Sequence, residues 1–306
     1  MKAVILGTTG YTGMVLLRLL SEHPDIDEII PVSSSKQGTD LEAVDPGIGN
    51  AVKEKTAKWD NKMVDISDAV KEQPDVVFAG IPHLASAKEC EPFFGKSVVV
   101  DLSADFRIKE AELFFQAYKE EVPRKDLLEK SVFGLCEIYH DEIKKYDIIA
   151  NPGCYPTCTL LPIIPLAAKG LIKGKIITNA MSGISGAGKK AKIGNIFCER
   201  TENTCAYLPG QTHRHFTEIK KEINYFDDSL DIMFTPHLVP LKRGMHATTA
   251  VEMTKEISEA DIKAVFEEYY SDSPFINLKG GVLPDTRDVW GSNRCDIAWQ
   301  VHGSTV

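Results

Sequence analysis

The sequence has no long hydrophobic run and no surplus of positive charge. No stretch of about 18 consecutive apolar residues occurs that could cross a bilayer as a helix. The formal net charge is −9, whereas proteins that bind nucleic acid carry clustered basic surface. The opening residues, "MKAVILG", lack the long apolar core and cleavage site of a signal peptide. We therefore expect a cytoplasmic protein that neither spans a membrane nor binds nucleic acid.

The sequence also lacks a cysteine pattern typical of disulfides or of zinc. Its seven cysteines are odd in number and scattered, and no Cys-x-x-Cys pair recurs at zinc-finger spacing. In a reducing compartment most of them are expected to be small buried hydrophobes. We predict no disulfide framework and no metal site.

In the first half, short apolar runs alternate with helical patterns. "KAVILG" at residues 2–7 has the character of a strand, and "GYTGMVLLRLLSEHP" follows with apolar residues at helical spacing. "IDEIIPVSSS", "PDVVFAGIP" and "SVVVDLSA" are further short runs bounded by turn signals. Strands that are apolar on both faces and alternate with helices indicate a parallel sheet covered on two sides. We predict an α/β fold whose first domain, residues 1–150, is a doubly wound Rossmann-type sheet.

The second half has a different pattern. "TCTLLPIIPLAAKGLI" looks helical and is expected to begin at about Thr157, and "KIITNAMSGISGAGKKA" predicts a strand that enters a loop rich in glycine and serine. "DIMFTPHLVPL", "MHATTAVEMT" and "CDIAWQVHG" alternate apolar and polar residues, as antiparallel strands with one covered face do. Ser258 has the character of a cap at the start of a helix. We predict a mixed α+β domain over residues 151–306.

A glycine-rich segment, "GTTGYTG", lies between the first strand and the first helix. In this position backbone amides and the positive end of the helix dipole can meet a pyrophosphate. The spacing Gly-x-x-Gly-x-x-Gly is one residue longer at its start than the usual dinucleotide fingerprint, and the alternative is a plain tight turn. The predicted cofactor-binding residues are Gly7, Thr8, Thr9, Gly10, Tyr11, Thr12 and Gly13.

The end of the second strand favours NADP over NAD. An acidic residue there would bind a free ribose 2′-hydroxyl. This sequence has Ser33, Ser34, Ser35 and Lys36 instead, and hydroxyls with an ammonium group suit a 2′-phosphate. We predict that Ser33, Ser35 and Lys36 contact NADP; the alternative is an ordinary polar loop.

The stretch "NPGCYPTC", residues 151–158, holds a candidate nucleophile. Pro152 and Gly153 precede Cys154, and a helical segment follows, so the sulfur should lie at a helix N-terminus. Unpaired amides and the helix dipole stabilise a thiolate there and lower the pKa of the thiol. Cys158 lies one turn further along, where burial is expected. We predict that Cys154 is the nucleophile.

A thiolate nucleophile usually has a basic partner. Asn151 is near in sequence, and "QTHRHFTEI" contains His213 and His215 on either side of Arg214. Either histidine can act as an acid or a base near pH 7, and the arginine can hold an anion. The same residues can equally form a solvated polar turn, and the pattern alone does not decide between the two.

Two other stretches suit anions. "DLSADFR" puts Ser103 and Arg107 beyond the carboxyl end of a strand, the edge where open α/β sheets bind ligands. "SGISGAGKKA" contains Ser182, Gly183 and Ser185 in a loop whose backbone amides can bind phosphate or carboxylate. The structural alternatives are a capped turn for the first and a flexible loop for the second.

A nicotinamide cofactor with an activated cysteine implies thiolate attack on an acyl carbon, followed by hydride transfer. With this chemistry, the sequence resembles the N-acetyl-gamma-glutamyl-phosphate reductases of arginine biosynthesis, whose fold is of the glyceraldehyde-phosphate/semialdehyde dehydrogenase type. The stretches that carry the resemblance run in order from residue 7 to residue 244: "GTTGYTG", "DLSADFR", "FGLCEIY", "NPGCYPT", "SGISGAGKKA", "THRHFTEI" and "FTPHLVPLKRG".

The resemblance implies an NADPH-dependent reduction of N-acetyl-L-glutamyl 5-phosphate to N-acetyl-L-glutamate 5-semialdehyde with release of phosphate, by a homodimer or homotetramer. It assigns the nucleophile to Cys154 and the acid/base to the His-x-His segment, where we favour His215 over His213. The predicted cofactor contacts from the later loop are Ser185 and Gly186. The predicted substrate contacts are Ser103, Arg107, Asn151, Ser182, Gly183 and Arg214.

Three alternatives remain at this point. In the related aspartate-semialdehyde dehydrogenases the acid/base histidine follows the glycine of a later segment, whereas here Gly244 is followed by Met245, which favours the arginine-pathway enzyme. A non-catalytic dinucleotide-binding sensor would make Cys154 structural. A cysteine hydrolase would leave the glycine-rich segment unexplained.

The resemblance also concerns the end of the chain. The family's pattern continues with a terminal helix containing an Asn-Leu-x-Lys-Gly-Ala segment, whereas this sequence ends at Val306 in "HGSTV". We expect weaker NADP binding and exposed apolar surface on the first domain as a result.

Overall fold

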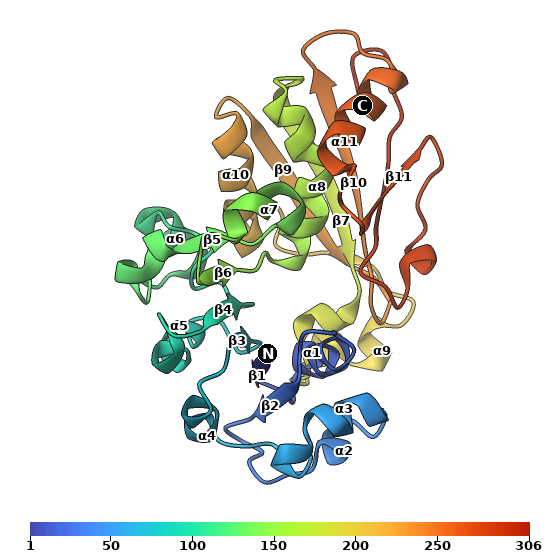
Figure 1. Ribbon diagram of the computed structural model, residues 1–306. Coiled ribbons are helices and arrows are strands. Elements are labelled where there is room, and N and C mark those ends of the chain that lie inside the picture. The colour runs from blue at the N-terminus through green and yellow to red at the C-terminus, as the bar shows by residue number, and fades with distance from the viewer. The chain divides into compact units, whose positions relative to one another are not determined.

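The computed structural model describes residues 1–306, which fall into two compact units. The first unit comprises Met1–Ala111 and Glu120–Pro152, and the second comprises Glu112–Lys119 and Gly153–Val306. The predicted domain boundary between residues 150 and 151 lies close to Gly153, where the chain enters the second unit. Figure 1 shows the helices and strands of each unit.

The first unit contains a six-stranded sheet in the order β2-β1-β3-β4-β6-β5, and every neighbouring pair is parallel. The strands are β1 (Lys2–Leu6), β2 (Glu28–Val32), β3 (Val76–Ala79), β4 (Val98–Asp101), β5 (Ser131–Phe133) and β6 (Ile148–Ala150). The predicted parallel sheet is confirmed. The chain reverses its direction of winding between β1 and β3, and open α/β sheets bind ligands beyond the carboxyl ends of the strands at such a point.

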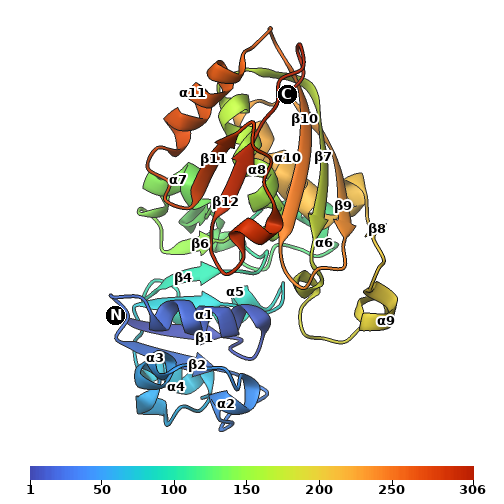
Figure 2. The same cartoon turned by 90° about the vertical axis from the view of Figure 1, so that its right-hand side faces the viewer.

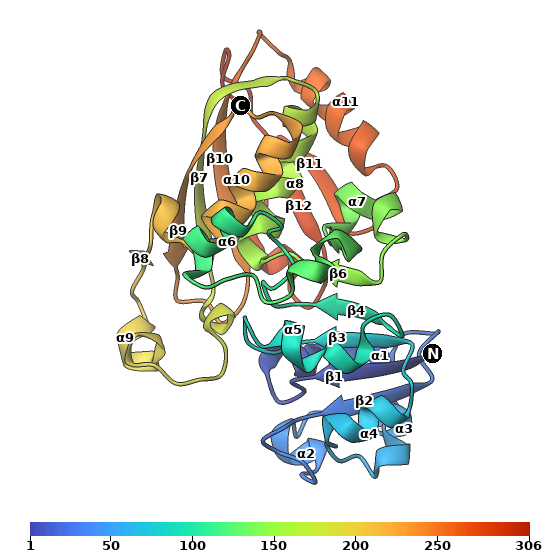
Figure 3. The same ribbon diagram turned by 90° about the vertical axis from the view of Figure 1, so that its left-hand side faces the viewer.

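Both faces of this sheet are buried, as the apolar runs predict. Alternate residues of β1 enter different clusters: Ala3 and Ile5 pack with Leu17 of α1 on one face, while Val4 and Leu6 belong to the cluster on the other. Figure 2 shows α1 over one face, and Figure 3, from the opposite side, shows α5 over the other. The helices of this unit are α1 (Tyr11–Ser21), α2 (Leu41–Val44), α3 (Asn50–Lys55), α4 (Ile66–Lys71), α5 (Ser86–Glu89) and α7 (Cys136–Ile143).

The second unit is built on a mixed four-stranded sheet in the order β10-β7-β9-β8. Its strands are β7 (Ile172–Ser182), β8 (Cys205–Ala206), β9 (Asp231–Leu238) and β10 (Met245–Met253), with a separate pair formed by β11 (Ile276–Gly280) and β12 (Cys295–Ala298). Its helices are α8 (Cys154–Ala168), α9 (Phe197–Arg200), α10 (Arg214–Phe226) and α11 (Glu259–Tyr270), and α6 (Ala111–Tyr118) lies in it apart from its first residue. The predicted α+β character is confirmed.

One face of the four-stranded sheet is covered and the other is open. Along β7 the buried Ile176, Thr178 and Ala180 alternate with the exposed Ile177 and Met181. Helix α8 packs against β7 and β10 on the covered side and also against α10. The alternation therefore follows the helical layer, as a half-covered sheet requires.

Three sequence-based predictions for this unit need comment. The prediction of antiparallel strands is confirmed for β10, which pairs antiparallel with β7. It is wrong for β12, which pairs parallel with β11, and it holds only in part for β9, which is antiparallel to β8 but parallel to β7. The helices that cover one face cause the alternation of burial, so this alternation does not indicate strand direction. Helix α8 begins at Cys154, earlier than the predicted start near Thr157. The predicted cap is confirmed, because Ser258 and Asp261 form a reciprocal capping box.

None of the helices combines the length and the apolar character that crossing a membrane would require.

Candidate functional site

Cys154 is the first residue of helix α8, and its side chain is exposed. Gly153 caps the helix with an extended backbone, at φ −64° and ψ 159°. The Thr157 amide and hydroxyl both donate to the Gly153 carbonyl, at 3.0 and 3.1 Å, which closes the first turn. The first amides of a helix have no partner within it and form the positive end of its dipole. The sulfur therefore lies where a thiolate is stabilised.

Cys158 lies one turn further along the same helix in a different environment. Burial raises the pKa of its thiol to about 12, and the nearby Cys295 and Cys154 act in the same direction. A thiol with so high a pKa stays protonated and is a poor nucleophile. The structure thus separates the two cysteines of "NPGCYPTC".

His213 caps the start of α10. Its Nδ1 accepts a hydrogen bond from the His215 amide at 3.1 Å, and its ring lies edge-on to the rings of Tyr155 and Tyr207, with centroids 5.5 and 5.4 Å away. Burial, assisted by the charge of Arg214, lowers the pKa of His213 from 6.5 to about 4. This imidazole is therefore neutral near pH 7, with its proton on Nε2.

His215 lies in the first turn of α10 and is also buried. Its ring centroid is 4.9 Å from that of His213 and 6.0 Å from that of Tyr155, the residue that follows Cys154. The Tyr155 hydroxyl donates to the His237 carbonyl at 3.1 Å. The starts of α8 and α10 are thus packed together through Tyr155, which follows the predicted nucleophile in the chain and contacts both predicted histidines.

Sequence reasoning missed Glu218, which is fully buried on α10. Its carboxylate accepts a hydrogen bond from the Gly153 amide at 2.9 Å, so α10 holds the backbone immediately before Cys154. A buried carboxylate is costly unless it is hydrogen-bonded. The sequence does carry a signal, because Glu218 precedes Ile219 on the apolar face of an amphipathic helix, where a charge needs an explanation.

The glycine-rich segment occupies the point in the first unit where the winding reverses. Gly7 has φ +80°, and a Cβ on it would lie 2.4 Å from the Gly80 carbonyl oxygen at the end of β3. A Cβ on Gly13 would lie 2.4 Å from the Gly7 carbonyl oxygen. Only glycine fits at either position, and the result is a close junction of β1, β3 and the N-terminus of α1. Thr8 braces this junction, because its buried hydroxyl donates to the Ile5 carbonyl at 2.9 Å.

The predicted 2′-phosphate contacts lie at the end of β2, the strand that pairs with β1. Ser33 is buried, and its amide donates to the Val64 carbonyl at 3.2 Å. Ser35 and Lys36 are exposed. These two side chains can reach a ligand at the carboxyl edge of the sheet, whereas Ser33 belongs to the framework.

Ser103 and Arg107 are both buried in the first unit and bonded within it. The Ser103 hydroxyl donates to the Asp101 carboxylate at 2.9 Å, and burial raises the pKa of Asp101. The Arg107 guanidinium donates to the Asn151 carbonyl at 2.7 Å and to the Leu102 carbonyl at 2.9 Å. Both side chains hold the chain that leads to Pro152, and their predicted contact with a substrate stays a prediction.

The serine and glycine loop after β7 is paired with the segment between β9 and β10. The amides of Gly183, Ile184 and Ser185 donate to the carbonyls of Gly244, Leu241 and Lys242. The Ser182 hydroxyl donates to the Gly183 carbonyl at 3.0 Å. These three amides are therefore engaged with backbone carbonyls, which removes them from the predicted anion cradle; the exposed Gly186 lies beyond the paired stretch.

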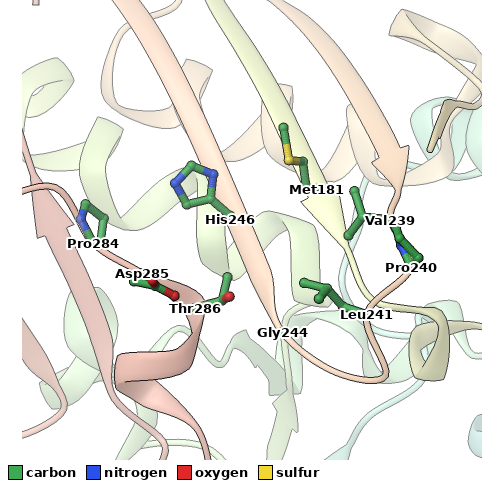
Figure 4. Close-up of a pocket in the computed structure, with 9 residues that line it drawn as sticks. All are labelled: Met181, Val239, Pro240, Leu241, Gly244, His246, Pro284, Asp285 and Thr286. Atoms are coloured by element: carbon green, nitrogen blue, oxygen red, sulfur yellow. The ribbon is translucent and has the colours of Figure 1, made fainter. Parts of the chain in front are cut away.

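A cavity of about 390 Å³ is lined in part by the segment between β9 and β10 (Figure 4). It opens between the start of β10 and the 3-10 turn at Thr286–Val289. Its lining residues are Met181, Val239, Pro240, Leu241, Gly244, His246, Pro284, Asp285 and Thr286. Neither Cys154 nor the two histidines of α10 line it, so this cavity is separate from the predicted nucleophile and acid/base residues. The structure contains no cluster of three or more His, Cys, Asp or Glu side chains arranged to hold a metal ion.

Comparison with known families divides the chain as the structure does. Residues 2–146 match the model described as "Semialdehyde dehydrogenase, NAD binding domain", and residues 154–306 match "Semialdehyde dehydrogenase, dimerisation domain". The first match agrees with the dinucleotide site predicted at the glycine-rich segment.

Curated relatives match over almost the whole chain. A protein of Alkaliphilus metalliredigens is 40% identical over 308 residues, covering 99% of this chain and 87% of its own length. One from Caldicellulosiruptor bescii is 39% identical over 311 residues, with the same coverage. Both are named N-acetyl-gamma-glutamyl-phosphate reductase.

Solved structures show the same fold at low identity. Aspartate semialdehyde dehydrogenase II of Vibrio cholerae, in complex with ASA, superposes with a TM-score of 0.71 at 18% identity, covering 99% of this chain and 90% of its own. The Candida albicans aspartate semialdehyde dehydrogenase with NADP has a TM-score of 0.63 at 17% identity, covering 94% and 84%. At these identities the likeness concerns the fold alone.

Proposed function

Because the chain belongs to the N-acetyl-gamma-glutamyl-phosphate reductases of the semialdehyde dehydrogenase family, we propose that it reduces N-acetyl-L-glutamyl 5-phosphate to N-acetyl-L-glutamate 5-semialdehyde, with release of phosphate, in arginine biosynthesis. The observation that carries the proposal is the position of Cys154, exposed at the start of α8, where the next residue, Tyr155, packs against the two histidines of α10. A sensor that only bound a dinucleotide would have no use for a thiol placed there.

Cys154 is the nucleophile. Its thiolate attacks the acyl carbon of the substrate and displaces phosphate to form a thioester. Amides of the first turn of α8 stabilise the oxyanion that develops on the acyl oxygen. Glu218 keeps this turn in place through the Gly153 amide. NADPH, when bound, supplies the hydride that reduces the thioester.

His215 is the acid/base, with His213 as its positioning neighbour. An acid/base near neutral pH works best with a pKa close to the working pH. The pKa of His213 is about 4, and its Nδ1 is occupied by the His215 amide. His213 therefore fixes the first turn of α10, and His215 transfers the proton when the hemithioacetal collapses.

The cofactor is NADP, held at the carboxyl edge of the first sheet. The close junction at Gly7 and Gly13 lets backbone approach a pyrophosphate at the N-terminus of α1. Lys36 and Ser35 are exposed at the end of β2, where they suit a 2′-phosphate. The Ser185 amide is engaged with the Lys242 carbonyl, and the exposed Gly186 stays a predicted cofactor contact. Reversing the charge in Lys36→Glu should raise the KM for NADPH at least 10-fold relative to that for NADH.

The substrate carries a phosphoryl group and a carboxylate, and Arg214 holds one of these anions. Arg214 is exposed at the first position of α10, close enough to His213 to lower its pKa. Asn151, which lies three residues before Cys154 in the chain, and the Ser182 hydroxyl are the further proposed contacts; the Gly183 amide is engaged with the Gly244 carbonyl and is not proposed as one.

The protein works as a homo-oligomer, a dimer or tetramer. Residues 154–306 match a dimerisation domain. The open face of its four-stranded sheet exposes Ile177, Met181 and Met233, with 48%, 39% and 44% of their surfaces accessible, and contiguous apolar surface of this kind typically marks an interface. Light scattering during gel filtration measures the assembly directly; a monomer at micromolar concentration would contradict this part of the proposal.

The central test is the reverse reaction, the phosphate-dependent reduction of NADP by N-acetylglutamate semialdehyde. Wild-type protein should catalyse it and Cys154→Ser should not. Equal rates for the two proteins would refute the assignment of the nucleophile. Aspartate semialdehyde is the matched alternative substrate, and turnover of that compound alone would assign the chain to the aspartate pathway.

A further inference from the structure

The segment that connects β9 to β10 carries two basic side chains that the proposed mechanism does not use. Lys242 and Arg243 are adjacent and exposed, and neither side chain makes an ion pair or hydrogen bond in the structure. In a chain of net charge −9 with many surface ion pairs, two neighbouring cations without acidic partners are available for an external anion.

The backbone of this segment is fixed firmly. The amides of Ile184 and Ser185 donate to the carbonyls of Leu241 and Lys242 at 2.9 and 3.1 Å, and Gly183 donates to Gly244 at 3.0 Å. A Cβ on Gly183 would lie 2.9 Å from the Arg243 nitrogen, so the two backbones pack without space for a side chain. Arg243 is therefore held directly against the loop that follows β7.

This loop lies at the end of the sheet that faces the nucleophile. Tyr155, the neighbour of Cys154, donates its hydroxyl to the His237 carbonyl in β9, and it interacts with the Ser182 side chain at the end of β7. Strands β7 and β9 run parallel, with Ser182 opposite Leu238. The segments that leave both strands thus start beside the Tyr155 hydroxyl. Arg243 lies further along the segment after β9, where its backbone packs against Gly183, the residue next to Ser182.

Arg107 and the backbone amides after β7, which the sequence offered as anion-binding groups, are already engaged. The Arg107 guanidinium donates to the carbonyls of Asn151 and Leu102. The amides of Gly183, Ile184 and Ser185 donate to carbonyls. A substrate with two anionic groups needs a second cation besides Arg214, and an arginine with a fixed backbone and an exposed head group meets that need.

We propose that Arg243 binds an oxyanion of the substrate, either its phosphoryl group or its carboxylate, and this inference rests on the proposed function. The guanidinium presents a fork of N–H donors that pairs with two oxygens of a phosphate or carboxylate at once, which the ammonium of Lys242 cannot do. Arg243 is thus a substrate-binding residue that neither its sequence motif nor the cysteine–histidine cluster identifies.

The experiment compares Arg243→Met, Arg243→Lys and the matched neighbour Lys242→Met in the reverse reaction, with N-acetylglutamate semialdehyde, inorganic phosphate and NADP each varied. All three variants should keep the wild-type melting temperature, because neither side chain has a contact to lose. Arg243→Met should raise one KM, for phosphate or for the semialdehyde, by roughly 10- to 100-fold, the effect of one charge-assisted bond. The KM for NADP should not change, and Arg243→Lys should recover part of the loss.

A raised KM for phosphate assigns Arg243 to the phosphoryl group, and a raised KM for the semialdehyde assigns it to the carboxylate; either result supports the proposal. Unchanged KM values in Arg243→Met overturn it, as does an equal rise in Lys242→Met, which would reflect general electrostatic attraction. If wild-type protein shows no phosphate-dependent reduction of NADP, the proposed function fails first. If the wild type is active and Cys154→Ser is inactive, unchanged KM values in the Arg243 variants refute the role of Arg243 and leave the proposed function standing.

Discussion

The glycine-rich segment of the first unit and the cysteine–histidine cluster of the second are built in opposite ways. The first is a predicted cofactor site of seven consecutive residues, in which Gly7 and Gly13 are required because the carbonyl oxygens of Gly80 and Gly7 leave no room for a Cβ. The second joins the start of α8 to the start of α10, some 60 residues later in the chain, through side chains and one buried carboxylate. A site formed by consecutive backbone groups can therefore be recognised in the sequence as a motif. A site formed by side chains from distant segments can be recognised only once the fold is known.

The largest expected effect separates the two cysteines of the cluster. Cys154→Ala should lower kcat by at least about 10⁴-fold, since loss of a nucleophile removes the covalent route. Cys158→Ala should stay within a few-fold of wild type, because burial keeps that thiol protonated. Iodoacetamide labelling followed by peptide mass spectrometry checks the same contrast at neutral pH. Faster labelling of Cys158 than of Cys154 would invert the assignment.

A second prediction tests whether the glycine-rich segment depends on backbone geometry. Gly7→Ala should destabilise the first unit by about 3 kcal/mol, because it combines a positive φ with a Cβ placed 2.4 Å from the Gly80 oxygen. Gly38 is the matched control: it also has a positive φ, +75°, but no atom lies within 4 Å of the position that a Cβ on it would take, so Gly38→Ala should cost about 1 kcal/mol.

Urea unfolding and NADP binding measure both variants. Equal destabilisation in the two would show that φ alone matters and that the close approach of β1 to β3 does not constrain the site. Loss of NADP affinity in Gly7→Ala without loss of stability would instead point to a purely local role in binding.

Much of the fold follows from local patterns, and the exceptions have physical causes. Apolar runs such as "KAVILG" predict buried parallel strands because both faces must be covered, and the Ser258 cap is recognised because its partner Asp261 is three residues away. The direction of β9 is not recoverable in this way, because its burial pattern would be the same beside either neighbour.

The candidate site shows the same limit. The position of Cys154 at a helix start follows from Pro152, Gly153 and the apolar run after them. The bond from Gly153 to Glu218 joins residues 65 positions apart, and the pairing of Gly183 with Gly244 joins two loops. Such contacts depend on tertiary packing: the sequence can mark Glu218 as an unusual charge on an apolar helix face, but it does not identify the amide that Glu218 binds.

A third prediction concerns the buried carboxylate that joins the two helices. Glu218→Gln keeps the size of the side chain and a carbonyl acceptor for the Gly153 amide but removes the charge, so kcat should fall about 10- to 30-fold as the charge-assisted bond weakens. Glu222→Gln, one turn further along α10, is the control. Glu222 is also buried, and it forms an ion pair with Lys221 at 2.8 Å.

Steady-state kinetics and melting temperatures distinguish positioning from stability in these two variants. Glu218→Gln should lower kcat more than Glu222→Gln at a comparable change in melting temperature. If the two lower kcat equally, the link between α10 and Cys154 is only structural. The rate of Cys154 alkylation gives an independent measure, since a displaced first turn should change it in Glu218→Gln and not in the control.

The smallest expected effect is a pH dependence that originates in the cluster and is absent from the glycine-rich segment. The pKa of His213 is lowered to about 4 in the folded chain from 6.5. Between those values the unfolded chain binds a proton at this position and the folded chain does not, so the stabilisation is complete above about pH 6.5 and is lost as the pH falls towards 4.

The variant His213→Asn tests this dependence, because its side-chain oxygen can accept the His215 amide but binds no proton. Between pH 7 and pH 4.5 the free energy of unfolding should decrease in both proteins, and the decrease should be about 1–2 kcal/mol smaller in His213→Asn than in wild type. Urea unfolding at a series of pH values measures this difference, with the exposed His140 replaced by Asn as the control that should follow wild type. Parallel pH profiles for His213→Asn and wild type would mean that His213 is protonated in the folded chain at mild pH, which would return it to consideration as the acid/base in place of His215.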